Sequence, residues 1–261
     1  MAQQRIGDLA LARDGAVATL TIDRPAKLNA LASSFWGDLR ASLAAFESDG
    51  RTRIVILTGA GEKAFSAGGD IAGFAEMRGQ DVMRAFQHDA MAGFAAIERC
   101  RIPVMAAVNG LALGGGCELT LACDFAIASE QASFAMPEAS LGLVPGFGAI
   151  RAPEVIGRAM AKYMVATAER ISAQRAYEIG LVQEVVPHAA LMTRAREIAA
   201  MVAANSPFAL AIGKRLMNRQ IDQAAFDHSI EAITVLQSSA DRAEGVSAFL
   251  EKRKPKFGEE R

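Results

Sequence analysis

The chain has 261 residues, of which 51% are hydrophobic, as is typical of packed globular proteins. Its formal net charge of −1 argues against general nucleic-acid binding, which usually needs a basic surface. The three cysteines have no C-x-x-C spacing and the three histidines are scattered, so we expect neither a disulfide framework nor a metal site. No apolar stretch predicts a membrane span and residues 1–8 show no signal-peptide pattern, so we expect a cytoplasmic protein.

The first part of the chain alternates short apolar segments with helical patterns. Asp14-Gly15 between the apolar segments 9–12 and 16–22 predicts a β-hairpin, and Ser33 or Ser34 can cap a helix that runs to about Ser48. The following segments predict, in chain order, a buried strand at 54–58, a glycine-rich loop at 59–69, a helix at 81–99, a buried strand at 103–108, and short strands at 124–128 and 132–135.

From about residue 149 onward the pattern becomes helical. Helices are expected to begin near Ser172, Pro187, Ser206, Asp222 and Asp241, with a short extended piece at 182–186. No proline- or glycine-rich linker separates the two parts. We therefore predict an α/β core domain over residues 1–186 and a C-terminal helical segment over residues 187–261.

Three segments contain residues that could bind a ligand or take part in catalysis. Small residues at 66–69, just after a buried strand, let the backbone approach a ligand with exposed N–H groups, although a tight turn would look the same. The glycines at 114–116 precede an apolar run and are typical of a helix N-terminus that something approaches closely. The third segment runs from Phe134 to Gly146 and contains a Pro-Glu pair.

Glu118 and Glu138 are carboxylates placed in these apolar and small-residue stretches. A carboxylate is costly in such surroundings unless it is paired or used, and two of them could do acid–base work on one substrate. Each also has a structural alternative, because Glu118 favours the helix dipole and Pro137-Glu138 is an ordinary helix start. The residues alone do not decide between these interpretations.

Taken together, the motifs resemble those of the crotonase, or enoyl-CoA hydratase/isomerase, family. The resemblance covers nearly the whole chain and rests on the order of IDRP (22–25), LNAL (28–31), AFSAGGDI (64–71), AVNG (107–110), GGGCEL (114–119), PE (137–138), RISA (170–173), GLV (180–182) and EGVSAFLEKR (244–253). It implies a spiral of ββα units followed by C-terminal helices, and an assembly into homotrimers or hexamers made of two trimers. Apolar residues of the C-terminal helices, including Ile230, Ile233, Val235 and Leu236, fit such contacts.

The resemblance also implies the reaction, which is addition of water across the double bond of a 2-enoyl-CoA, as in fatty-acid β-oxidation. Coenzyme A is then part of the substrate, and no separate cofactor, nucleic acid or membrane partner is expected. By the matching motifs, Glu118 and Glu138 are the acid–base pair and the backbone N–H groups of Ala67 and Gly115 form the oxyanion hole. The remaining substrate-binding positions implied are Lys27, Asn29, Ala30, Ser66, Gly68, Asp70, Ile71, Gly114 and Gly146, the last helping to place the water.

The chain departs from the family pattern at several points. Ala72 stands where many members carry a basic residue, so Lys252, Lys254 or Lys256 are alternatives for the phosphates, and residues 147–152 border the acyl pocket with an unusual sequence. An enoyl-CoA isomerase, another lyase of the family and a non-catalytic RNA-binding homologue stay open. Retention of both glutamates favours hydration, and near-neutral charge argues against RNA binding.

Overall fold

A computed structural model describes residues 4–218 and 223–255 of the chain. A large sheet in it begins with the expected hairpin, in which β2 (Leu9–Asp14) and β3 (Val17–Ile22) are antiparallel. From β3 onward the pairs are parallel, and the strand order is β1-β2-β3-β4-β6-β8-β11. The remaining strands of this sheet are β1 (Gln4–Ile6), β4 (Ile54–Gly59), β6 (Val104–Val108), β8 (Phe125–Ser129) and β11 (Glu184–Val186).

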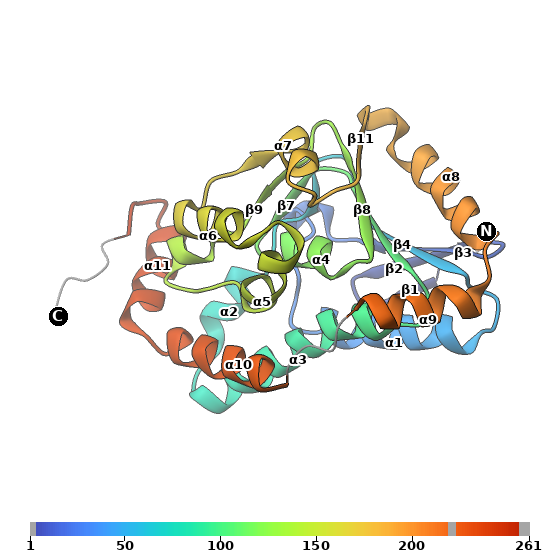
Figure 1. The fold of residues 1–261 in the computed structure, drawn as a ribbon. Helices are drawn as coiled ribbons and strands as arrows, with labels where there is room; N and C mark the ends of the chain where they lie inside the picture. Colours follow the sequence, from blue (N-terminus) through green and yellow to red (C-terminus); the bar gives the residue numbers. More distant parts are fainter. Residues whose placement is uncertain (1–3, 219–222, 256–261) are drawn as a thin grey trace.

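Helices cover both faces of the parallel part of this sheet, and for that reason every residue of β4 and β6 is buried. Ile54 and Ile56 pack with α8 (Leu191–Ala203), while Val55 and Leu57 belong to the main core beneath α1 (Phe35–Ser48). Figure 1 shows α8 lying apart from the other helices, against the large sheet. The alternation follows from the two-residue period of a strand.

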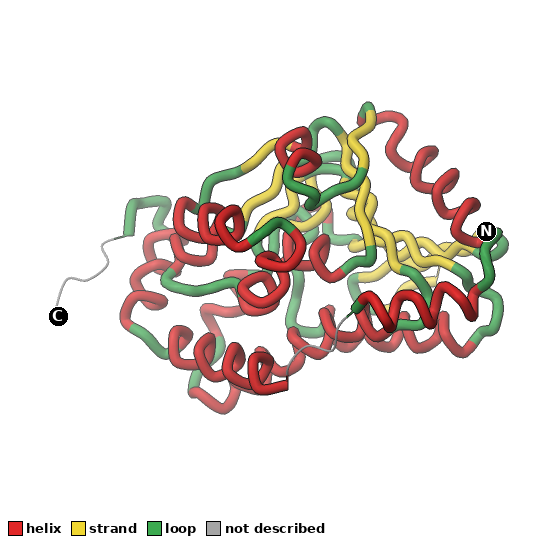
Figure 2. The backbone as a smooth tube through the Cα atoms, in the orientation of Figure 1, coloured by secondary structure: helices red, strands yellow, loops and turns green. Residues whose placement is uncertain are grey.

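A second, smaller sheet has the order β10-β9-β7-β5, with parallel pairs except at β10. Its strands are β5 (Ala64–Ser66), β7 (Leu111–Leu113), β9 (Ser133–Ala135) and β10 (Ile171–Ser172). Figure 2 shows the two groups of strands meeting near the centre of the molecule. Helix α4 (Gly115–Ala122) lies there and contacts β5, β6, β7, β8 and α5. Its Gly116 packs so tightly on β5 that a Cβ there would overlap the carbonyl oxygen of Ser66.

The C-terminal helices pack on the core of their own chain. Helix α10 (Gln223–Gln237) contacts α3 (Gln80–Arg99) and α5 (Gly146–Val155), and α11 (Ala240–Leu250) contacts the 3-10 turn η2 (Pro137–Leu141). Ile230 and Ile233 are accordingly buried within the chain, whereas Val235 is exposed. The side chain of Leu236 lies outside the described residues. The remaining helical elements are α2 (Ile71–Glu76), α6 (Arg158–Thr167), α7 (Ala173–Glu178), α9 (Pro207–Met217), η1 (Pro25–Lys27) and η3 (His188–Ala190).

The observed elements confirm the predicted α/β class, the helix at 81–99 and the helix starts near Ser172 and Ser206, where each serine caps its helix. Ser34 precedes α1 as predicted but makes no side-chain capping bond, and Asp222 lies outside the described residues. The loop predicted at 59–69 contains β5, and helix α2 follows it unpredicted. In the described part of the chain, no helix has the length and hydropathy needed to cross a membrane.

Candidate active site

Helix α4 brings Glu118 into the interior of the molecule. Gly114 precedes the helix with φ 50° and ψ −122°, a conformation that favours glycine, and its carbonyl oxygen accepts the first helical bond from the N–H of Glu118 at 2.9 Å. Glu118 therefore lies in the first turn, as predicted, and its side chain is buried.

Glu138 approaches the same point from the opposite side. Pro137 starts the short 3-10 turn η2, which carries Glu138 toward Gly114. A Cβ at Gly114 would stand 2.9 Å from Glu138 Oε1, so only glycine leaves room for the carboxyl group here. Glu138 Oε2 is buried without a hydrogen-bond partner in the described structure. A buried oxygen of this kind is available to a substrate or a water molecule.

Burial raises the pKa of both carboxyl groups. The pKa of Glu118 rises to about 7, although the backbone N–H groups of Gly148 and Phe147 oppose the rise by stabilising the ionised form. Burial, followed by the nearby charge of Glu118, raises the pKa of Glu138 well above its ordinary value. Near neutral pH this favours an ionised Glu118 beside a protonated Glu138, which is an arrangement suited to a base and an acid.

Helix α5 holds the ionised partner in place through a residue that the motifs did not indicate. The N–H of Gly148, in its first turn, donates to Glu118 Oε1 at 2.7 Å. Gly146 begins the same helix and lines the cavity described below, and its role in placing water stays a prediction. The missed signal was the pair of glycines at 146 and 148 opening a helix near a carboxylate.

The prediction for Ala67 is wrong in its register. The N–H of Ala67 donates to the carbonyl oxygen of Leu28 at 2.9 Å and is therefore occupied. Gly69 instead lies opposite Leu31 in an isolated parallel β-bridge. The two hydrogen bonds of this bridge come from the neighbours of Gly69: the N–H of Leu31 donates to Gly68 O, and the N–H of Asp70 donates to Leu31 O. Because successive residues of an extended segment direct their N–H groups to opposite sides, the N–H of Gly69 faces away from Leu31.

Gly69 lies beside Gly115, the other residue predicted for the oxyanion hole. A Cβ at Gly115 would be 3.8 Å from the nitrogen of Gly69, and Gly115 is the first residue of α4, where N–H groups have no partner within the helix. Both residues line the same cavity. The fold therefore brings the backbone of Gly69 and of Gly115 together at one cavity.

One cavity of about 150 Å³ joins these groups. Predicted residues in its wall are Ala67, Gly68, Ile71, Gly114, Gly115, Glu118, Glu138 and Gly146. The rest of the wall is mostly apolar and comes from α1, α3, η2, α5, α10 and α11, for example Trp36, Phe94 and Ile233. Cavities of this kind, apolar with a few convergent polar groups, are where small molecules bind.

The remaining predicted residues lie outside the wall of this cavity and hold the adjoining loop together. Asn29 is fully buried, and its side-chain amide donates to the carbonyl oxygens of Ala60 and Ala64 at 2.9 and 2.6 Å. Asp70 forms two ion pairs through Oδ2, one with Arg24 Nη2 at 2.9 Å and one with Nζ of the exposed Lys27 at 3.2 Å. These contacts hold the loop in place beside the cavity-lining residues Ala67, Gly68 and Gly69.

Two further residues of the loop have internal roles. Ser66 is fully buried, and its Oγ accepts the N–H of Gly68 at 3.2 Å. The carbonyl oxygen of Ala30 accepts a hydrogen bond from Arg24 at 2.6 Å. Arg24, which the motif analysis named only as part of IDRP, therefore organises the loop through both Ala30 and Asp70. Direct substrate contacts by Lys27, Asn29, Ala30, Ser66 and Asp70 stay a prediction.

Comparison with known proteins assigns the family. The model described as "Enoyl-CoA hydratase/isomerase" matches residues 12–260. The chain belongs to the enoyl-CoA hydratase/isomerase family. A short-chain-enoyl-CoA hydratase from Clostridium acetobutylicum is 42% identical over 256 residues, which are 95% of this chain and 97% of the relative. A 2,3-dehydroadipyl-CoA hydratase from Escherichia coli K12 is 36% identical over 256 residues, covering 97% of this chain and 99% of the relative.

Solved structures of the enoyl-CoA hydratase/isomerase family share the fold. The crystal structure of an enoyl-CoA hydratase from Bacillus anthracis has a TM-score of 0.78 at 38% identity, covering 97% of this chain and 100% of that one. The similarity spans the C-terminal helices as well as the sheets. The family match therefore covers nearly the whole chain, including the segments that supply both glutamates.

Proposed function

We propose that the chain hydrates 2-enoyl-CoA thioesters to 3-hydroxyacyl-CoA. The observation that carries this proposal is the convergence of Glu118, Glu138 and the two N–H groups of Gly69 and Gly115 on one largely apolar cavity. A hydration needs a base for water, an acid for carbon and stabilisation of negative charge on the thioester oxygen. The site provides a residue for each of these.

The thioester carbonyl oxygen accepts hydrogen bonds from Gly69 and Gly115. Negative charge develops on this oxygen when water adds to the β-carbon, because the electrons of the double bond move toward the carbonyl group. The dipole of α4 adds to the effect, since Gly115 is at the N-terminal end of the helix. One such donor is typically worth about 3–4 kcal/mol of transition-state stabilisation.

The two glutamates divide the proton transfers. Glu118, held in its ionised form by Gly148, takes a proton from water as the water oxygen bonds to the β-carbon. Glu138, kept protonated by burial and by the charge of Glu118, gives its proton to the α-carbon. A proton exchange between the pair then restores the starting state. The contacts of the two carboxyl groups support these roles. Glu118 accepts the N–H of Gly148, which favours its ionised form, whereas Glu138 Oε2 is buried without a partner among the described residues, which favours the protonated form.

The coenzyme A nucleotide lies beside the loop that contains Lys27 and Ala30. Lys27 is exposed and holds its position through Asp70, so its ammonium group can approach a phosphate. Lys252 and Lys254 are exposed cations near the end of the described chain, and Lys256 lies outside the described residues. Contacts from these lysines to the phosphates are the least supported part of the proposal.

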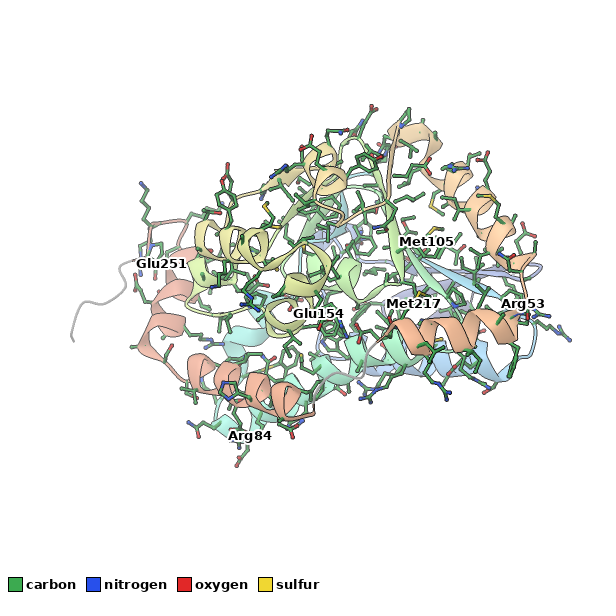
Figure 3. All side chains as sticks on the ribbon, viewed as in Figure 1. Arg53, Arg84, Met105, Glu154, Met217 and Glu251 are labelled. Atoms are coloured by element: carbon green, nitrogen blue, oxygen red, sulfur yellow. The ribbon has the colours of Figure 1, made fainter. Side chains whose placement is uncertain are left out.

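We also propose that the chain assembles into a homotrimer, or a hexamer of two trimers. Helix α9 exposes Phe208, Leu216 and Met217, whose exposed fractions are 76%, 72% and 77%. Met217, labelled in Figure 3, is the last residue of α9. Large apolar side chains gathered on one helix are typical of a contact between subunits. Light scattering at micromolar concentration tests the assembly, and a purely monomeric protein would contradict it.

Hydration of crotonyl-CoA, followed by loss of absorbance of the conjugated thioester, tests the reaction. Glu118→Gln and Glu138→Gln should each lower kcat by about 100-fold or more, because the substitution removes proton transfer but keeps the shape. Glu178→Gln, on the exposed face of α7, is the matched control and should behave as the unmodified protein. Near-normal hydration by either site variant rejects the assignment. Conversion of a 3-enoyl-CoA in place of hydration would identify an isomerase.

A further inference from the structure

The backbone that carries Gly69 is attached to a residue from a distant part of the chain, Leu31. Gly69 lies opposite Leu31 in a parallel β-bridge. The N–H of Leu31 donates to Gly68 O at 2.8 Å, and the N–H of Asp70 donates to Leu31 O at 2.9 Å, so both hydrogen bonds that flank Gly69 use the backbone of Leu31. The position of the Gly69 N–H is therefore set by the backbone of Leu31.

The side chain of Leu31 contacts the other proposed donor, Gly115. Leu31 is 1% exposed and belongs to the main hydrophobic core. A Cβ built on Gly115 would be 3.2 Å from Leu31 Cδ1, and the same Cβ would be 3.8 Å from the nitrogen of Gly69. A methyl group of Leu31 therefore lies against Gly115 on the side that faces Gly69.

Gly68 limits how the two donors can move. A Cβ at Gly68 would be 2.7 Å from Leu113 O and 3.3 Å from the nitrogen of Gly115, so the loop and the start of α4 are already in close contact. Because they cannot come closer, a change in their relative position has to begin beside Leu31, where a shorter side chain would leave a gap. Packed groups move partly into such a gap.

Leu31 has no direct access to the substrate. The wall of the cavity includes Gly68, Gly69 and Gly115 but not Leu31. An effect of Leu31 on the reaction must therefore pass through the two glycines. The two contacts of Leu31 are of different kinds, since its backbone holds Gly69 and its side chain holds Gly115.

We infer that Leu31 is a positioning residue that sets the two N–H groups of the oxyanion hole relative to each other. The inference rests on the proposed function, in which Gly69 and Gly115 donate to the thioester oxygen. Two donors stabilise one oxygen fully only when both are aimed at it before the reaction begins. A misplacement of about 1 Å can lower a rate by about 100-fold, so a single packing contact is enough to matter.

Three substitutions of Leu31 test the side-chain contact while the backbone bridge stays. Leu31→Val removes the Cδ atoms that reach Gly115, Leu31→Ala removes more, and Leu31→Met restores the length. We expect kcat for hydration of crotonyl-CoA to fall by about tenfold in Leu31→Val and by about tenfold to 100-fold in Leu31→Ala, with KM nearly unchanged. Leu31→Met should keep most of the activity, because it preserves the volume of the side chain.

Leu43→Ala is the matched control. Leu43 of α1 is 2% exposed and belongs to the same core as Leu31, but it does not line the cavity. Leu43→Ala should lower the free energy of unfolding about as much as Leu31→Ala, since both delete a buried side chain of the same size. It should leave kcat unchanged.

The carbonyl stretch of the bound thioester distinguishes positioning from a loss of stability. Isotope-edited infrared spectra use crotonyl-CoA, with and without a label at the thioester carbon, bound to protein that carries both Glu118→Gln and Glu138→Gln to prevent turnover. Hydrogen bonds to the carbonyl oxygen polarise the C=O bond and lower its stretching frequency. We expect Leu31→Val and Leu31→Ala to return the band toward that of the free thioester, and Leu31→Met and Leu43→Ala to leave it in place.

Failure of the inference and failure of the proposed function give different results. If the unmodified protein does not hydrate crotonyl-CoA, the proposed function is wrong. If it does, and Leu31→Val and Leu31→Ala keep both kcat and the carbonyl band, the positioning role of Leu31 is overturned. An equal shift of the band in Leu43→Ala also overturns it, because the effect would then follow from lost packing anywhere in the core. If Leu31→Ala does not fold, Leu31→Val decides.

Discussion

Arg151 of α5 and Glu98 of α3 form a buried ion pair one helical turn beyond a pair of stacked rings. Arg151 Nη2 donates to Glu98 Oε2 at 2.7 Å, and Nε lies 2.6 Å from Oε1. The rings are Phe147 and Phe94, each four residues earlier on its helix, with centroids 4.8 Å apart. Two contacts at successive turns fix how α5 lies along α3, and thereby fix the N–H of Gly148 against Glu118.

Arg151→Met should therefore impair catalysis at a distance. Loss of the pair leaves Glu98 buried without its counter-charge and frees the start of α5, so the Gly148 N–H moves from Glu118. We expect kcat to fall by roughly tenfold to a hundredfold, the size of effect that small misplacements produce. The pH at which activity is half-lost on the acid side should rise, because Glu118 loses a stabilising donor. Arg175→Met, an exposed change on α7, should alter neither value, and an unchanged pH profile in Arg151→Met would contradict this positioning role.

The pH dependence of activity should be bell-shaped. The pKa of Glu118 is raised to about 7, so kcat/KM should fall as the pH drops below this value and the base takes up a proton. The pKa of Glu138 is raised as well, so activity should also fall at high pH, where the acid loses its proton. The two limbs belong to the coupled pair. In Glu118→Gln, the residual activity should lose the acid limb, and retention of that limb would show that another group is the base.

Gly69→Ala and Gly69→Pro test the corrected oxyanion donor. Alanine keeps the N–H and should retain most of the activity, whereas proline removes it and should lower kcat by about 10²–10³-fold. The measurement is steady-state hydration of crotonyl-CoA, with thermal unfolding as a check that Gly69→Pro is folded. A folded proline variant with normal kcat would reject Gly69 as a donor.

Lys214→Met should lower the free energy of unfolding, although Lys214 lies outside the wall of the cavity. Lys214 of α9 is buried, pairs with Asp124 at 2.7 Å and donates to the carbonyl oxygens of Ile97 and Ile102 at 2.9 and 3.2 Å. Removing it leaves Asp124 buried without its cation, which typically costs about 3–5 kcal/mol. Urea unfolding gives the free energy, and Arg215→Met, an exposed neighbour, is the control. A loss below about 1 kcal/mol would show that the pair contributes little.

The sequence was a better guide to the position of the two buried carboxylates than to the position of the proposed oxyanion donor. Glu118 and Glu138 are carried by their own local motifs, a glycine-led helix start and a Pro-Glu turn, so neighbouring residues suffice to place them. The donor at Gly69 depends instead on a bridge to Leu31, far away in the chain. The motif named Ala67, two residues before Gly69, and the two differ only in their contacts with the distant segment 28–31: Ala67 N–H donates to Leu28 O, whereas Gly69 bridges Leu31. Motif comparison alone did not show these contacts.

Sequence patterns also did not predict the shortest elements, or which residues from distant parts of the chain line the cavity together. Strands β5 and β7 have three residues each, too few to show periodicity, and helix α2 has six. The wall of the cavity combines Gln87 with Gln237 and Arg242, which lie about 150 residues apart. Nothing near Gln87 in the chain indicates this neighbourhood, because it arises only when α10 packs against α3.

The packing of α10 and α11 over the cavity has a consequence for how acyl preference changes between relatives. Both glutamates and both N–H donors come from segments before α6, whereas Ile233, Gln237, Arg242 and Val246 come from the last two helices. The residues that contact the acyl chain thus come largely from α10 and α11, which are separate in sequence from the reacting groups. Exchange of α10 and α11 between family members would change which acyl chains fit the cavity and leave the two glutamates and the two N–H donors in place.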